Sequence, residues 1–214
     1  EFASKIGLEK VGRLIGLLHD MGKASNEFRD YILEVMENPK LFSSEKIDHS
    51  TASSKYLYEK YNPKSLDEKS QLKKILLEII TVSMMGHHGG LMDFVNKNAE
   101  SPYVNRIKKK LNNYNEVKNN FLIDLYSETQ IDKFFEEAVD ELYKYINGSI
   151  KPFEIGMTIK FLHSCLIDAD RLDAFRFSNE VKYYSQKADF LAYKASLEKY
   201  ISKFKSKSII DDMR

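Results

Sequence analysis

Apolar residues recur at helical spacing along almost the whole chain. No capping residue precedes the first series, so we expect the chain to begin inside a helix; its apolar members are Phe2, Ile6, Val11, Leu14, Ile15 and Leu18. Ser25 is placed to cap a second, short helix, which Asn38-Pro39 ends. The apolar face of this second helix consists of Phe28, Tyr31, Ile32 and Val35.

The central part of the chain predicts two further helices. One runs from His49 to Tyr61. The other contains the apolar stretch Leu72–Met85, and Ser65 and Glu68 before it have the spacing of a capping box. The glycine-flanked segment Gly86-His87-His88-Gly89-Gly90 ends this helix.

The second half of the chain is also predicted to be helical. Ser101-Pro102 has the form of an N-cap followed by proline at the first helical position, and the polar, lysine-rich helix it begins extends to about Lys118. Three amphipathic segments follow, at about Gln130–Tyr145, Phe153–Phe175 and Gln186–Phe204.

These patterns predict an all-α protein, a compact helical bundle with short connections. No segment has the alternation of a strand, and the chain contains only 9 Gly and 4 Pro. A length of 214 residues favours one domain. We expect it to cover residues 1–204, with the polar tail 205–214 as a linker.

Composition excludes several classes of protein. The net charge of +1 lacks the basic excess of duplex DNA binders, and the lysine runs at 108–110 and 203–207 are interpreted as solvated helix faces. A single cysteine, Cys165, excludes an internal disulfide and fits a reducing compartment, so we expect a cytoplasmic protein. No apolar run is long enough to span a membrane, and no Gly-rich phosphate loop is present.

The candidate chemistry lies in histidine and aspartate residues at helix ends. His19-Asp20 follows the first apolar series, and the other members are far apart in sequence, as expected for a cluster assembled in space: His49, His87-His88 and Asp170. Imidazole with carboxylate suits Mn, Ni, Co, Fe or Zn, whereas Mg, a further possibility, prefers oxygen ligands. The aspartate of an adjacent pair can bridge two ions about 3.5–4 Å apart. The cluster therefore predicts a metal-dependent phosphoesterase, in which the metal site places the phosphodiester for in-line attack.

Two of these positions have other interpretations. His49, like its neighbours Asp48 and Ser50, is also suited to start a helix. Asp170 is preferred to the two other carboxylates of its helix, Asp168 and Asp173, because it lies seven residues after His163 and therefore on the same face.

Three further residues each have two interpretations. His163 is interpreted as a core residue or as a support for the metal ligands. Lys23 fits the end of a helix, and it is also placed to hold a substrate phosphate. Ser164 is a candidate hydrogen-bond donor to substrate, or a helix serine bonded to its own backbone.

Four segments together resemble the HD nuclease of type I CRISPR systems. They are Gly16-Leu17-Leu18-His19-Asp20-Met21-Gly22-Lys23-Ala24 with downstream Phe28, Asp48-His49-Ser50, Gly86-His87-His88-Gly89, and the stretch from Ser164 to Asp173. The resemblance implies an HD-domain phosphohydrolase fold and cleavage of single-stranded DNA exposed by an RNA-guided surveillance complex. It also implies a helicase partner, in cis or in trans, and residues 208–214 are similar to the join that leads into that helicase.

The resemblance also assigns ligands. It implies one metal on His19, Asp20 and Asp170 and a second on Asp20, His49, His87 and His88, with Asp20 bridging and Lys23 contacting phosphate. The family has a further metal-binding histidine on the helix before the HD motif. This chain has no histidine before His19, so we expect that residue upstream of Glu1 and expect the His49, His87 and His88 site to hold metal more readily.

Two other functions use the same residues. One is an HD-type nucleotide or cyclic-dinucleotide phosphohydrolase, against which the adjacent histidines His87-His88 argue. The other is a non-catalytic interaction module with a structural metal or a decayed site; the complete ligand sets argue against decay, whereas the helix expected upstream of Glu1 keeps this alternative open.

Overall fold

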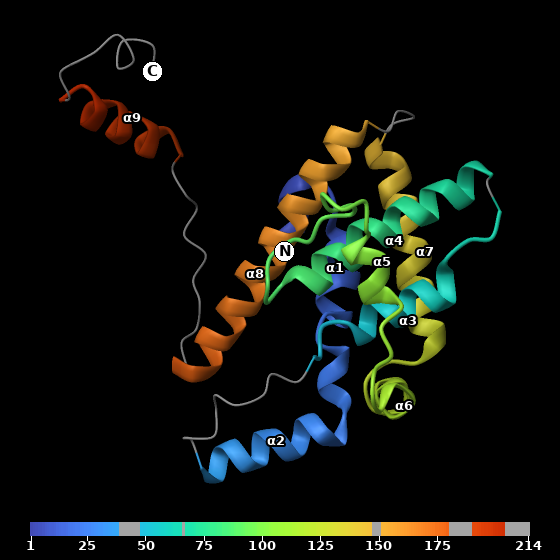
Figure 1. Ribbon diagram of the computed structural model, residues 1–214. Helices are drawn as coiled ribbons and strands as arrows, with labels where there is room; N and C mark the ends of the chain where they lie inside the picture. The colour runs from blue at the N-terminus through green and yellow to red at the C-terminus, as the bar shows by residue number, and fades with distance from the viewer. Residues whose placement is uncertain (39–47, 66, 147–150, 180–189, 204–214) are drawn as a thin grey trace. The chain divides into compact units, whose positions relative to one another are not determined.

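The computed structural model describes residues 1–38, 48–65, 67–146, 151–179 and 190–203 (Figure 1). Within these ranges every regular element is a helix, which confirms the all-α class. The elements are η1 (Ala3–Ile6), α1 (Glu9–Leu18), η2 (Met21–Ala24), α2 (Asn26–Glu37), α3 (Ala52–Tyr61), α4 (Glu68–Gly86), α5 (Pro102–Ile107), α6 (Tyr114–Asp124), α7 (Glu128–Ile146), α8 (Pro152–Asn179) and α9 (Phe190–Ile201).

The chain separates into two compact units, Glu1–Ala174 and Phe175–Arg214. The first unit contains the core and every candidate site residue. The second contributes the end of α8 and the helix α9 to the described residues. The predicted linker 205–214 lies outside the described residues, so the predicted domain limits stay predictions. No described helix has both the length and the apolar character that crossing a membrane would need.

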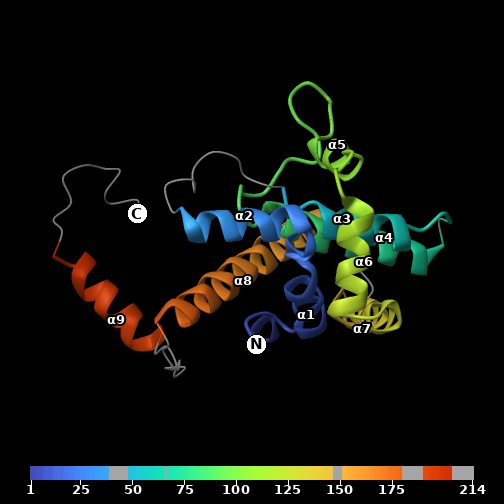
Figure 2. The same cartoon turned by 90° about the horizontal axis from the view of Figure 1, so that it is seen from below.

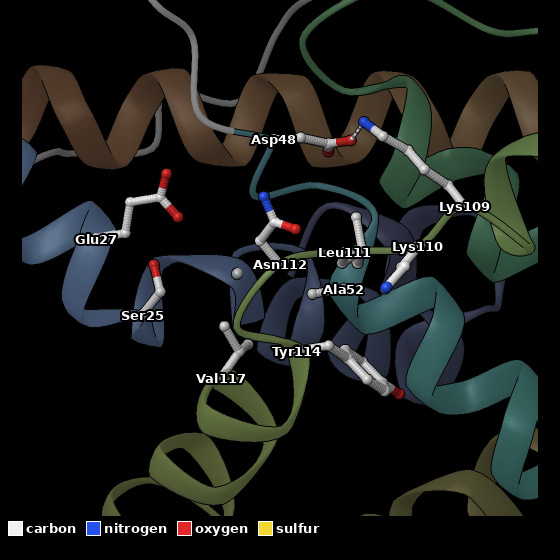
Figure 3. Close-up of a pocket in the computed structure, with 11 residues that line it drawn as sticks. Ser25, Glu27, Asp48, Ala52, Lys109, Lys110, Leu111, Asn112, Tyr114 and Val117 are labelled. Carbon is white, nitrogen blue, oxygen red and sulfur yellow. Dashed lines mark hydrogen bonds and ion pairs between the residues drawn. The ribbon is translucent and has the colours of Figure 1, made fainter.

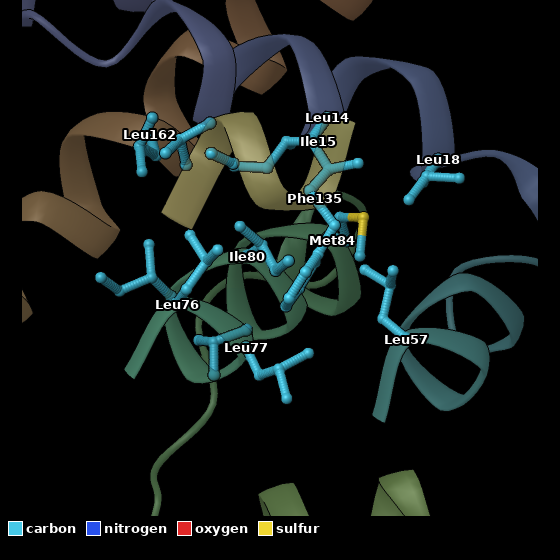
Figure 4. Close-up of a cluster of buried hydrophobic side chains, with 14 of the residues drawn as sticks. Leu14, Ile15, Leu18, Leu57, Leu76, Leu77, Ile80, Met84, Phe135 and Leu162 are labelled. Carbon is cyan, nitrogen blue, oxygen red and sulfur yellow. The ribbon is translucent and has the colours of Figure 1, made fainter. Parts of the chain in front are cut away.

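The core of the first unit forms where α1 packs against α7 and α4, and where α3 packs against α4 (Figure 2). Buried side chains from five helices meet there (Figure 4), among them Leu14, Ile15 and Leu18 of α1, Leu57 of α3, Leu76, Leu77, Ile80 and Met84 of α4, Phe135 of α7 and Leu162 of α8. Burying each of these side chains contributes about 1.5–3 kcal/mol. This apolar core fixes the ends of α1 and α4, where four of the candidate ligands lie.

A polar contact aligns α1 as well. Leu8, at the N-cap of α1, provides no side-chain cap, but the Glu141 carboxylate of α7 accepts hydrogen bonds from the backbone N–H groups of Lys10 and Val11, at 2.7 and 2.9 Å. A carboxylate at this position satisfies unpaired N–H groups and complements the helix dipole.

Two predicted helices are wrong in extent. The first series of apolar residues is not one helix, because Gly7 adopts a left-handed conformation with φ of 76° and separates η1 from α1. The lysine-rich helix predicted to reach Lys118 instead ends at Ile107, and α6 begins after Asn113, whose φ is 58°. Glycine and asparagine tolerate this backbone conformation, which interrupts a helix.

The predicted caps are partly confirmed. Ser25 accepts a hydrogen bond from the Phe28 N–H, and Ser101 accepts one from the Val104 N–H. Asp67, not Ser65, caps α4, because its carboxylate accepts from the Ser70 N–H.

Two other expectations need correction. The predicted apolar face of α2 contains no fully buried residue. The helix predicted from His49 begins only at Ala52, so His49 lies in the segment that leads into α3. The start of the last helix, predicted at Gln186, lies outside the described residues.

Candidate metal centre

The structure brings all six predicted ligands together in the first unit. His19 and Asp20 form the turn between α1 and η2, His49 precedes α3, and His87-His88 follows the last residue of α4. They make two groups that share one aspartate. In each group, one ligand atom per residue lies within 4.8 Å of the others: Asp20, His49, His87 and His88 in the four-ligand group, and His19, Asp20 and Asp170 in the three-ligand group.

The two carboxylate oxygens of Asp20 face different groups. Its Oδ1 lies 3.8 Å from Nε2 of His49 and 3.7 Å from Nε2 of His87. Its Oδ2 lies 3.1 Å from Nε2 of His19, and that nitrogen is 3.7 Å from Oδ1 of Asp170. A carboxylate placed in this way can serve one ion with each oxygen.

Unsatisfied polar atoms show that these residues suit bound metal. Within the described part of the chain, Nε2 of His19, Nε2 of His87 and Oδ1 of Asp20 are buried and have no hydrogen-bond partner. The 3.1 Å approach of His19 to Asp20 is an ion-pair contact without hydrogen-bond alignment. Buried polar groups are normally satisfied, so atoms that converge without partners suit a bound cation. Imidazole and carboxylate together suit divalent transition metals.

The imidazole rings are oriented for ligation. Nδ1 of His19 donates to the backbone carbonyl of Gly16 at 2.9 Å, and Nδ1 of His87 donates to the carbonyl of Met84. A proton held on Nδ1 leaves the lone pair of Nε2 directed into the centre. His49 and His88 also face each other, with their Nε2 atoms 2.7 Å apart.

The protonation states suit a cation site. Burial favours the neutral form of Asp20, but its close contacts with the His19 and His87 imidazoles and its hydrogen bond from Lys23 outweigh burial and hold the pKa of this carboxyl far below its ordinary value. Burial and the neighbouring imidazoles of His87 and His49 lower the pKa of His88 to about 4. At neutral pH, Asp20 is therefore a carboxylate and His88 a neutral imidazole, which are the forms that bind metal.

The pKa of His19 is shifted upward, opposite to that of His88. Burial lowers the pKa of His19, but the close contact with the negatively charged Asp20 carboxylate outweighs burial and raises it. A cation would compete with a proton for the Nε2 lone pair of His19.

The other predicted site residues, Lys23, Ser164 and His163, belong to neither group. Lys23 pairs with Asp20, with Nζ 2.7 Å from Oδ2. Ser164 is exposed on α8. The Nε2 of His163 is buried without a partner in the described chain, against the Cα of Gly86, where an added Cβ would lie 3.2 Å from it.

Gly22 is a residue of the site whose role the sequence did not reveal. A Cβ on Gly22 would overlap the backbone of His49, so the turn after Asp20 packs directly on a ligand. The available signal was the glycine that follows the His-Asp pair, but its contact partner lies 27 positions away in a different segment.

A pocket of about 300 Å³ adjoins this region (Figure 3). Gly22 and Asp48, each next to the ligand-bearing turns, form part of its wall, and Lys109, Lys110 and Asn112 form another part. None of the six candidate metal-binding residues lines this pocket. It therefore borders the segment that carries His49 without being the metal centre itself.

A family model described as "Cas3, HD domain" matches residues 4–159. The chain belongs to this family. It is therefore an HD-type hydrolase that depends on metal, and a CRISPR-associated one. The matched region includes five of the six candidate ligands of this Cas3 HD domain. Asp170 lies beyond its end, so the choice of Asp170 as a ligand rests on its position beside His19 and Asp20. Searches of curated proteins and of solved structures found no match.

Proposed function

We propose that this Cas3 HD domain is a nuclease that cleaves phosphodiester bonds of single-stranded DNA in CRISPR interference, using two metal ions bridged by Asp20. The placement of the Asp20 oxygens carries the proposal, because one oxygen faces the four-ligand group and the other faces His19. A two-ion centre suits phosphodiesters because such hydrolysis develops charge on both the attacking and the leaving oxygen.

The residues of the chain have separate tasks. When bound, the ions supply activation of water and neutralise charge on the leaving oxygen. Asp20 would contribute one carboxylate oxygen to each ion, and the backbone carbonyls of Gly16 and Met84 orient His19 and His87. Lys23 pairs with Asp20 in this structure, and it would instead hold a phosphate oxygen of the substrate.

The donor set indicates which metals suit the site. Four imidazoles and two carboxylates favour Mn, Ni, Co, Fe or Zn, and Mg remains an alternative.

The charge of the chain bears on its partners. A net charge of +1 gives little attraction for DNA at long range, so we infer that a helicase, in cis or in trans, delivers the strand from the RNA-guided surveillance complex. We place this reaction in the cytoplasm.

A substrate panel tests the proposal. The chain is incubated with Mn, Ni, Co or Mg and with circular single-stranded DNA, duplex DNA, nucleotides or cyclic dinucleotides. We expect cutting of the circular single strand, abolished in Asp20→Asn. Turnover of nucleotides alone would identify a phosphohydrolase, and bound metal without any turnover would identify an interaction module. Either result would reject the nuclease.

A further inference from the structure

The segment that carries His49 lacks the support of a helix. The described chain resumes at Asp48, and α3 begins only at Ala52. His49 therefore lies outside the hydrogen-bonded part of the helix. A ligand in such a segment keeps its direction only if other contacts fix its neighbours.

Side chains from the end of α5 make those contacts. Arg106 donates from Nη2 to Oγ of Ser50 at 2.7 Å and from Nε to Oγ1 of Thr51 at 3.0 Å. Both hydroxyls belong to buried residues, with Ser50 5 % exposed and Thr51 0 % exposed. One guanidinium thus fixes two consecutive residues directly after His49.

The residue before His49 is held by the same network. Thr51 accepts from Arg106 and donates its hydroxyl proton to the Asp48 carboxylate at 2.9 Å. Lys109 donates to the same carboxylate at 2.7 Å, which Figure 3 shows. The Asp48 carboxylate therefore accepts one bond from the Thr51 hydroxyl and one from the Lys109 ammonium.

We infer that Arg106, assisted by Lys109, is a positioning residue for the four-ligand metal group, and that it acts by fixing Asp48, Ser50 and Thr51 on both sides of His49. Arg106 belongs to neither ligand group. The inference rests on the proposed metal centre, and it concerns one of the two ions. Only Arg has the fork of donors that reaches both hydroxyls at once.

Calorimetric titration of the chain with Mn²⁺ tests this inference, with His88→Ala and Asp170→Ala used to assign the two binding events. In Arg106→Ala we expect the event assigned by His88→Ala to weaken about 10- to 100-fold, the usual loss when a group that supports a ligand is removed. The event assigned by Asp170→Ala should stay within about twofold. Arg106→Lys should give an intermediate affinity, because one ammonium restores part of the contact.

Arg13→Ala is the matched control. Arg13 joins α1 to α7, with Nη2 3.4 Å from the Glu137 carboxylate, and its side chain is 40 % exposed compared with 32 % for Arg106. It has no contact with the His49 segment. If Arg106 had a purely structural role, Arg106→Ala would lower the melting temperature, as we expect Arg13→Ala to do, without separating the two metal affinities. Equal weakening of both events, or of neither, would overturn the inference.

Two further measurements keep the inference testable if Arg106→Ala does not fold or if the proposed nuclease activity is not found. Ser50→Ala removes a single acceptor and should weaken the same event by a smaller factor, with little further loss when combined with Arg106→Ala. Histidine NMR of the metal-free chain should show His49 and His88 shifted in Arg106→Ala and His19 unchanged. These readouts need no DNA cleavage, so a chain that binds metal but cuts nothing would reject the nuclease and leave this inference standing.

Discussion

Gly22 lies directly against the backbone of His49, with no room for a Cβ between them. This contact joins the turn after His19-Asp20 to the segment before α3, two parts of the chain that supply ligands to the same group. The spacing between Asp20 and His49 therefore depends on a residue without a side chain.

Gly22→Ala should separate these two ligands. The new methyl group would overlap the His49 backbone, and we expect the mutation to destabilise the fold by about 1–3 kcal/mol and to weaken metal binding at least tenfold. Urea unfolding and a Mn²⁺ titration measure the two effects.

Gly156→Ala is the control for this change. A Cβ at Gly156 meets nothing within 4 Å, so alanine at this position of α8 should stabilise the protein by about 0.4–1 kcal/mol and leave metal affinity unchanged. If Gly22→Ala behaved in the same way, the close contact would have no role in forming the site.

Lys23→Met should separate metal binding from catalysis. Removing the ammonium frees Oδ2 of Asp20 from its ion pair, so Mn²⁺ affinity should stay the same or rise. Loss of a charged donor to phosphate should lower kcat/KM on single-stranded DNA about 10- to 100-fold. Lys23→Arg retains the charge and should retain most of the activity. Unchanged cleavage in Lys23→Met would remove Lys23 from the substrate site.

His163→Leu should leave both metal affinities unchanged. The Nε2 of His163 is buried without a partner in the described residues and belongs to neither ligand group. Replacing an unpaired buried polar group by an apolar one of similar size is about neutral or stabilising, so the free energy of unfolding should not fall by more than about 0.5 kcal/mol. Loss of a bound ion in this variant would make His163 a ligand.

The stability of the bundle should depend on pH through Asp132 on α7. Burial slightly favours its neutral form, but hydrogen bonds from Lys60 and Tyr61 outweigh it and lower the pKa of Asp132. A lowered pKa in the folded state stabilises the fold above the unfolded value of about 3.9, and this stabilisation is lost as pH falls through the folded value.

Asp132→Asn should therefore cost about 0.5–1 kcal/mol at pH 7, a modest value because the side chain is 48 % exposed. In urea unfolding, the gap between mutant and wild type should shrink below pH 4. Asp140→Asn, an exposed change on the same helix, should show no such dependence. A gap that widened at low pH would contradict the assigned direction.

The sequence predicted the helices well where the apolar period was long. Both α4 and α7 follow uninterrupted apolar patterns, and their ends lie close to the expected positions. The breaks at Gly7 and Asn113 were missed because a single left-handed residue leaves the apolar period almost unchanged. Propensity alone does not reveal such a backbone turn.

The candidate ligands were also predictable, because histidine at helix ends beside aspartate or glycine has few structural uses. The contacts that support them were not. Arg106 lies in a basic segment that reads as a solvated surface, and its hydrogen bonds to Ser50 and Thr51 join residues more than 50 positions apart. Only the packing of α5 beside α3 places them together.

The bridging role of Asp20 is tested most directly by anomalous diffraction from Mn²⁺-soaked crystals. We predict two peaks about 3.5–4 Å apart with the Asp20 carboxylate between them. The peak on His49, His87 and His88 should have the higher occupancy, because that group offers four ligands and the group of His19 and Asp170 offers three. A single peak, two peaks without Asp20 between them, or higher occupancy on the side of His19 would contradict the account.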